Sequence, residues 1–151
     1  MVLFAAIVAY VHYGAIMLLA ALLTTEFLLL RQGNLVKSIR ALERADLAYV
    51  TCGVLALLSG ALRFGTSAKG IGFYAGHPMF WLKLFLFGTL ALTSFLVTRH
   101  YSRWAHHARM DTTFTVPATE VCAALTMVKI QMALLALLPL LATLMARNIF
   151  L

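Results

Sequence analysis

Four long apolar segments separated by charged connections are the feature that most restricts how this chain can fold. They cover residues 2–30, 47–64, 79–97 and 121–150. A membrane-crossing helix needs about 20 mostly apolar residues, because the hydrocarbon core holds no water to satisfy free backbone groups. The sequence therefore predicts a single integral membrane domain over residues 1–151, folded as an all-α bundle of four transmembrane helices.

The composition excludes two other classes of protein. Hydrophobic residues make up 63% of the chain and charged residues 11%, which is too apolar for a soluble domain. The formal net charge is +7, but the basic residues are scattered between apolar segments instead of gathered on one polar face. We therefore expect contact with a lipid bilayer and no nucleic-acid partner.

The basic residues predict the orientation in the membrane. The first and third connections hold seven of them: Arg31, Lys37, Arg40, Arg44, Arg99, Arg103 and Arg109. The second connection and the tail hold three: Arg63, Lys69 and Arg147. Because basic loops stay on the cytoplasmic side, the count predicts that both termini lie outside a bacterial inner (plasma) membrane that the chain crosses several times.

The first connection also has a helical pattern. Leu35, Ile39 and Leu42 recur at helical spacing, opposite basic side chains. We expect a short amphipathic helix there, anchored on the inner surface of the membrane.

His12 is the histidine that lies well inside a predicted span. It shares a face of the first helix with Glu26, because a seven-residue step returns a helix to within about 20°. An ionisable group at this depth is expensive, and it indicates either a neutral histidine bonded to a neighbouring helix or a metal-bound cofactor ligand. Glu26, near the inner interface, is either an ion-pair partner of a basic residue in the first connection (Arg31, Arg40 or Arg44) or a proton acceptor.

Lys83 follows Trp81 near the outer end of the third span. Its stem could snorkel to the headgroups. Alternatively, the predicted topology places it with Arg63, Arg147 and His12 in the outer half of the bundle. One histidine and three cations suit haem b, with the iron on His12 and the propionates near the cations.

A stripe of small residues runs along the second span. Gly53, Ala56 and Gly60 either let two helices approach closely or leave room for a flat ligand such as haem.

Three sequence patterns resemble known families. Pro78, Trp81 and Lys83 in "HPMFWLKLFLFG", Thr98 and Trp104 in "TRHYSRW", and Pro139, Met145 and Arg147 in the last helix resemble a bacterial family of four-span membrane proteins of unknown function. More distantly, His12 together with Trp81 and Lys83 is similar to the membrane-bound protoporphyrinogen oxidases. That resemblance implies haem binding through a first-span histidine and a lysine that follows a tryptophan.

These observations leave two functions open. The first is a haem-b-associated redox protein with His12 as axial ligand, Lys83, Arg63, Arg147 and Trp81 near the cofactor, and Glu26 handling protons or forming an ion pair. The second is a non-catalytic accessory or assembly subunit that contacts other subunits of a membrane complex.

Overall fold

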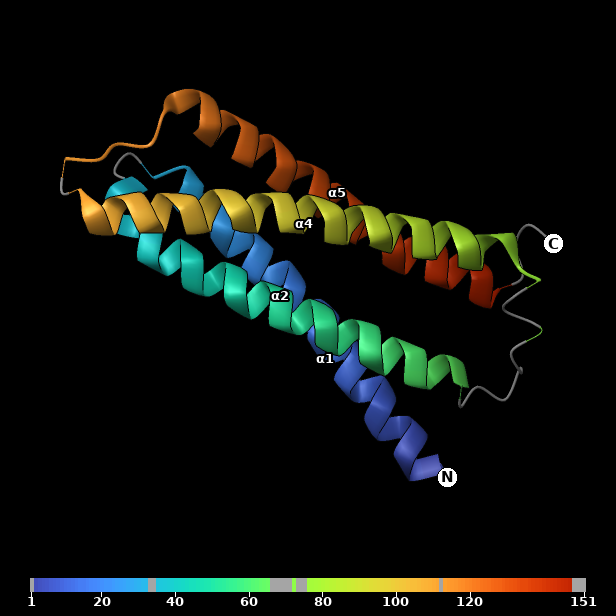
Figure 1. Ribbon diagram of the computed structural model, residues 1–151. Coiled ribbons are helices and arrows are strands. Elements are labelled where there is room, and N and C mark those ends of the chain that lie inside the picture. Colours follow the sequence, from blue (N-terminus) through green and yellow to red (C-terminus); the bar gives the residue numbers. More distant parts are fainter. Residues whose placement is uncertain (1, 33–34, 66–71, 73–75, 112, 148–151) are drawn as a thin grey trace.

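The computed structural model describes residues 2–32, 35–65, 72, 76–111 and 113–147, and the regular structure within them is helical. Four long helices follow one another: α1 (Val2–Leu30), α2 (Leu35–Gly65), α4 (Pro78–Met110) and α5 (Ala118–Ala146) (Figure 1). Each is long and apolar enough to cross a membrane. The prediction of an all-α fold with four spanning helices is confirmed.

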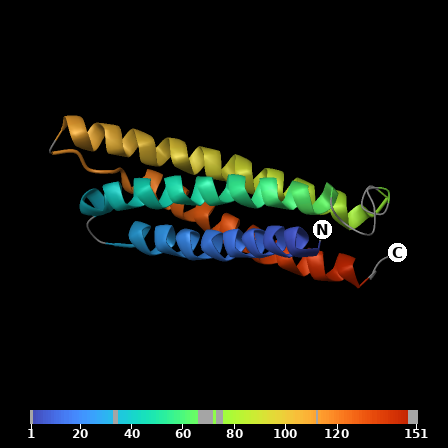
Figure 2. The ribbon, with the colours of Figure 1, turned by 90° about the horizontal axis from the view of Figure 1, so that it is seen from below.

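The helices run alternately in opposite directions and form a ring. Helix α1 packs against α2 and α5, and α4 packs against the same two helices. Helix α1 begins and α5 ends at one end of the bundle, which we call the terminal end (Figures 1 and 2). At the opposite, connection end, α1 leads into α2 and α4 leads into α5. Which end faces outward stays a prediction from the basic residues.

Helix α2 corrects the expectation of a separate amphipathic helix in the first connection. It is continuous from Leu35 to Gly65 and so begins well before the predicted span. Ile39 is 2% exposed and Leu42 is fully buried, so the apolar face packs against the bundle and not against the membrane surface. The helical spacing of the apolar residues is present as predicted. That spacing does not distinguish a helix face that contacts lipid from one that contacts protein.

Helix α4 also extends past its predicted span. It begins after His77, whose Nδ1 accepts a 3.3 Å hydrogen bond from the Met79 amide, and Pro78 occupies its first turn. It then continues through residues expected in a connection, where Tyr101 and Trp104 are each 1% exposed. These two aromatic side chains are part of the core.

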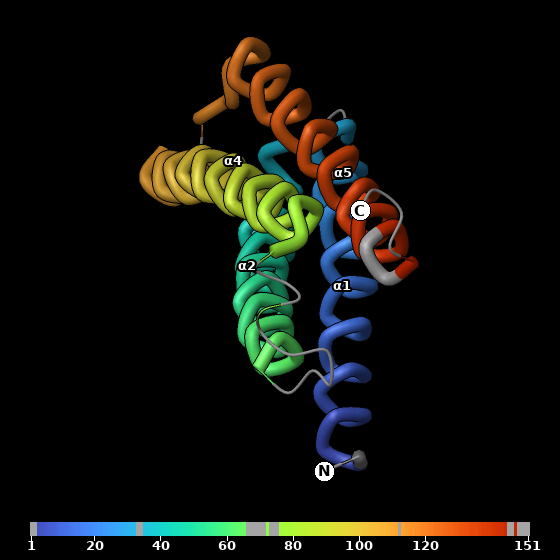
Figure 3. Tube along the Cα trace, turned by 90° about the vertical axis from the view of Figure 1, so that its right-hand side faces the viewer, coloured from blue at the N-terminus to red at the C-terminus, as the bar shows by residue number. Residues whose placement is uncertain are grey.

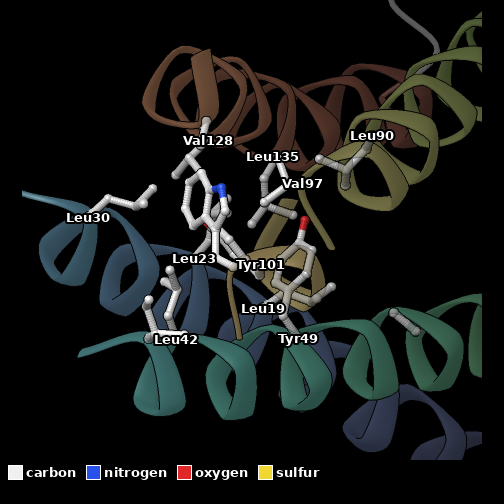
Figure 4. Close-up of a cluster of buried hydrophobic side chains, with 14 of the residues drawn as sticks. Leu19, Leu23, Leu30, Leu42, Tyr49, Leu90, Val97, Tyr101, Val128 and Leu135 are labelled. Carbon is white, nitrogen blue, oxygen red and sulfur yellow. The ribbon is translucent and has the colours of Figure 1, made fainter. Parts of the chain in front are cut away.

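The core lies nearer the connection end. All four helices contribute buried side chains to it, including Leu23, Leu42, Tyr101 and Val128 (Figure 4). The α1–α2 pair diverges from the α4–α5 pair towards the terminal end (Figures 1 and 3). Consistent with this divergence, α4 has no buried residue between its start at Pro78, at the terminal end, and Leu90. Polar groups at the two ends therefore lie in different surroundings.

Candidate functional site

Two carboxyl groups lie in the core, one on α1 and one on α2. Glu26 is 1% exposed and Asp46 is 4% exposed. The two groups are close enough to interact electrostatically. Buried carboxyl groups are rare in proteins unless they are paired with cations or serve a function.

Helical spacing explains why both groups point inward. Glu26 is on the buried face of α1 that also carries Leu19, Leu23 and Leu30. Asp46 is on the buried face of α2, one turn before Tyr49. The packing that buries these apolar side chains also buries the two carboxyl groups, so they do not contact water or lipid headgroups.

Helix α4 supplies the hydrogen-bond donors for both carboxyl groups. The Thr98 hydroxyl donates to Asp46 Oδ1 over 3.0 Å, and the Tyr101 hydroxyl donates to Glu26 Oε2 over 3.4 Å. The second bond is long and therefore weak, and Glu26 Oε1 has no hydrogen-bond partner among the described residues. The hydroxyl of Tyr49 likewise has none.

A buried amide on α5 belongs to the same core. Gln131 is 1% exposed, and its Nε2 has no hydrogen-bond partner among the described residues. It lies on the α5 face that carries Ala124, Val128 and Leu135. Each of the four helices thus contributes at least one polar side chain to an otherwise apolar interior.

No basic side chain neutralises these carboxyl groups in the part of the chain that the structure describes. The two ion pairs found there join Arg103 to Glu120 and Arg109 to Glu43. The ion pair considered for Glu26 from the sequence is not formed, and the guanidinium of Arg31 instead lies 5.5 Å from the ring centroid of Phe27.

His12 is on α1 near the terminal end, and its side chain contacts α2. Its Nδ1 is 3.0 Å from the carbonyl oxygen of Ala56 and 3.1 Å from the Ser59 hydroxyl. A carbonyl oxygen can only accept, so Nδ1 carries the hydrogen, and the lone pair of a neutral imidazole is on Nε2. His12 therefore bonds to a neighbouring helix, as one of the two interpretations expected, and still retains a nitrogen that can bind a ligand.

Gly60 makes the close approach of His12 possible. A Cβ atom at this position would lie 3.1 Å from Cε1 of the His12 ring, whereas a Cβ at Gly53 would meet nothing within 4 Å. The small residue at position 60 thus accommodates an imidazole, and the space beside it is filled by the protein itself. This favours the packing interpretation of the small-residue stripe at Gly60.

Two cations predicted near His12 lie at the same end of the bundle. The charges of Lys83 and Arg63 both act electrostatically on the His12 ring. The Arg63 guanidinium stacks 4.8 Å from the centroid of the Tyr13 ring, and Lys83 is half-buried. His12, Arg63 and Lys83 thus lie on three helices near the terminal end, and a common cofactor site for them stays a prediction.

The predicted cofactor roles of Trp81 and Arg147 stay predictions. Trp81 is 59% exposed and packs edge-on against Phe80. Arg147 follows the end of α5 and is exposed, and no described contact joins it to His12. Among the described residues, no group of three or more His, Cys, Asp or Glu side chains could hold a metal ion.

The comparisons with known proteins assign the chain to a family. The family described as "Predicted membrane protein (DUF2214)" matches residues 4–149. The chain belongs to this family. The resemblance to a four-span family of unknown function is therefore confirmed, whereas no similarity to a haem-dependent oxidase is shown. No curated protein and no solved structure matches the chain.

Sequence reasoning identified Glu26 but not the groups around it. Asp46, Thr98 and Tyr101 lie just outside the predicted spans 47–64 and 79–97, so the sequence analysis did not place them in the core. A signal was present, because Asp46 falls in register with Ile39, Leu42 and Tyr49 on the buried face of α2. Following that periodicity into the charged segment would have placed a second carboxyl group in the core.

Proposed function

We propose that this four-span membrane protein binds and releases protons inside the bilayer, at the carboxyl pair of Glu26 and Asp46. One observation carries the proposal: two buried carboxyl groups interact across α1 and α2 with no basic partner among the described residues. Intramembrane acidic residues of this kind mark proton and ion pathways.

The physical argument rests on repulsion between like charges. Two carboxylates in a water-poor interior repel each other strongly, because the low dielectric screens their charges little. Protonation of either group removes one charge and the repulsion with it, whereas ionisation of both groups restores the repulsion. The pair is therefore suited to hold one proton and to pass it on when water or another acceptor gains access.

The neighbouring side chains fit such a role. The hydroxyls of Tyr101 and Thr98 contact the two carboxyl groups. Tyr49 and Gln131 contribute buried polar atoms that have no hydrogen-bond partner within the described part of the chain. Hydroxyl groups both donate and accept hydrogen bonds, so they can exchange a proton with a neighbour without a large movement.

The proposal is tested by infrared spectroscopy on the protein in lipid nanodiscs. We expect a C=O stretching band of a protonated carboxyl group that persists at pH values where ordinary carboxyl groups are ionised. The band should disappear in Glu26→Gln or Asp46→Asn, whichever group holds the proton. Glu120→Gln is the matched control, because Glu120 is paired with Arg103 and its removal should leave the band unchanged.

Proton flux tests the release step. In proteoliposomes that contain a pH-sensitive dye, an imposed potential should drive proton movement in the wild-type protein and the Glu120→Gln variant. It should not do so in Glu26→Gln. A folded wild-type protein with no protonated carboxyl band, or flux that survives both Glu26→Gln and Asp46→Asn, would overturn the proposal.

A second candidate function, redox chemistry associated with haem b, is favoured by the state of His12. Metal-bound histidines commonly donate their second ring N–H to a backbone carbonyl, as His12 Nδ1 does to Ala56. In this proposal Nε2 of His12 would hold the iron, and Lys83 and Arg63 would pair with the carboxylates of the cofactor. Haem b would supply one-electron transfer.

Absorption spectra of the purified protein, oxidised and reduced, test this second candidate. A Soret band that is lost in His12→Ala and retained in His106→Ala, a histidine exposed near the connection end, is the expected result. A colourless, folded protein that copurifies with a stoichiometric partner would instead support an accessory subunit. For either function, we propose the bacterial inner membrane as the location.

A further inference from the structure

A cavity of about 360 Å³ opens at the connection end, between the first turns of α2 and the last turns of α4. Neither candidate function uses it. Its walls combine apolar and basic side chains: Val36, Lys37, Ile39, Arg40, Ala105, Ala108 and Arg109.

The charged side chains of the cavity are basic. Arg40 and Lys37 come from α2, and Arg109 comes from α4. The Arg109 guanidinium donates a 2.6 Å hydrogen bond to Glu43, which holds it in place between the two helices. A guanidinium has five N–H donors, so this bond leaves others for a second anion. Two arginines, Arg40 and Arg109, line the cavity and one carboxylate, Glu43, pairs with Arg109, so these three groups leave a net charge of about +1.

An exposed apolar face of α2 continues from the cavity towards the middle of the bilayer. At 100° per residue, Val36, Leu47, Val50 and Val54 fall within about 40° of one helix direction. Their exposed fractions are 38%, 68%, 37% and 52%. Glu43, which pairs with Arg109, lies on the same face between Val36 and Leu47, so the apolar part of the face runs from Leu47 onward. A molecule bound in the cavity therefore has an apolar track beside it along the membrane normal.

We propose that this cavity binds the phosphate headgroup of an anionic phospholipid, with an acyl chain lying along the exposed face of α2. Charge complementarity selects an anion, because basic pockets between membrane helices attract lipid phosphates. The apolar track favours a lipid over a free phosphate, since inorganic phosphate would gain nothing from it. Arginine gives such a site specificity, because its planar fork bonds two phosphate oxygens at once.

The test uses the full-length protein in a neutral detergent, with phosphatidylglycerol and phosphatidylcholine as probes and native mass spectrometry as the readout. Phosphatidylglycerol should bind the wild-type protein more tightly than phosphatidylcholine. Each of Arg40→Gln and Arg109→Gln should weaken phosphatidylglycerol binding by about tenfold, as expected for loss of a charge-assisted hydrogen bond. Arg103→Gln is the matched control, because Arg103 is also on α4 and ion-paired, but it does not line this cavity.

Two further measurements complete the test. Arg40 has no ion pair in the described structure, so Arg40→Gln should fold even if Arg109→Gln, which releases Glu43, does not. Inorganic phosphate in excess should not displace the lipid. Equal binding of the two lipids, equal losses in Arg40→Gln and Arg103→Gln, or displacement by inorganic phosphate would each overturn the proposal.

Discussion

The hydroxyl of Thr98 on α4 donates a 3.0 Å hydrogen bond to Asp46 on α2, and so joins two helices through a buried carboxyl group. The two residues are 52 positions apart in the chain. Asp46 has no basic partner among the described residues, so this hydroxyl is a principal source of stabilisation for a group that burial disfavours.

Replacement of Thr98 by valine should therefore destabilise the fold. Thr98→Val keeps the shape of the side chain but removes the donor, and we expect a loss of about 1–3 kcal/mol in the free energy of unfolding. Thr89→Val is the control, because the Thr89 hydroxyl bonds the carbonyl of Phe85 in its own helix. Unfolding by SDS, followed by circular dichroism, compares the two. Equal effects would mean that the bond to Asp46 contributes nothing.

Alanine substitutions at Gly60 and Gly53, both on α2, form a second test variant and its control. Alanine at position 60 would press on the His12 ring, and we expect a loss of about 1–2 kcal/mol, as for other overpacked sites. Gly53→Ala meets nothing within 4 Å and should be neutral or stabilising by up to about 1 kcal/mol. The same SDS titration measures both variants. A Gly60→Ala protein as stable as Gly53→Ala would contradict the close approach of His12 to α2.

Asp111, just after α4, offers a pH-dependent test outside the spans. Hydrogen bonds from the Thr113 hydroxyl, at 2.6 Å, and from the Thr113 amide, at 2.8 Å, lower the pKa of its carboxyl group below the ordinary range for aspartate. These bonds favour the ionised form, so they stabilise the turn above the ordinary aspartate pKa and are lost as the pH falls through the lowered one.

Thr113→Val should raise the pKa of Asp111 towards the ordinary value, though not fully, because the amide donor remains. NMR titration of carboxyl-labelled aspartate measures this pKa directly. The chain has one other aspartate, so Asp46→Asn assigns the signals. An unchanged titration in Thr113→Val would show that the hydroxyl does not contact Asp111 in the membrane protein.

The orientation predicted from the basic residues can be tested by thiol labelling. In a chain with Cys52→Ala and Cys122→Ala, Gly65→Cys at the end of α2 should react with a membrane-impermeant reagent in intact cells. Thr115→Cys, between α4 and α5, should react only after permeabilisation. The reverse pattern would invert the topology and would move the proposed lipid site to the outer leaflet.

The inward face of α1 could be read from the sequence. His12 and Glu26 were predicted on one face, and that face carries the buried residues Val8, Leu19 and Glu26. In α2 and α4, by contrast, the predicted spans left out residues 35–46 and 98–110, which are helical in the structure. Charged residues in residues 35–46 and 98–110 resemble connections, yet one face of each segment packs against protein while the charges stay at the surface.

The sequence by itself determined that four apolar helices are long enough to cross a membrane, because apolar segments of about 20 residues match the thickness of the hydrocarbon core. Tertiary structure alone decided which polar groups meet. Glu26 and Tyr101 are 75 positions apart, and His12 and Ala56 are 44 apart. Helical periodicity fixes the direction of each side chain relative to its own helix axis, but the rotation and depth of one helix against another depend on packing of the whole bundle.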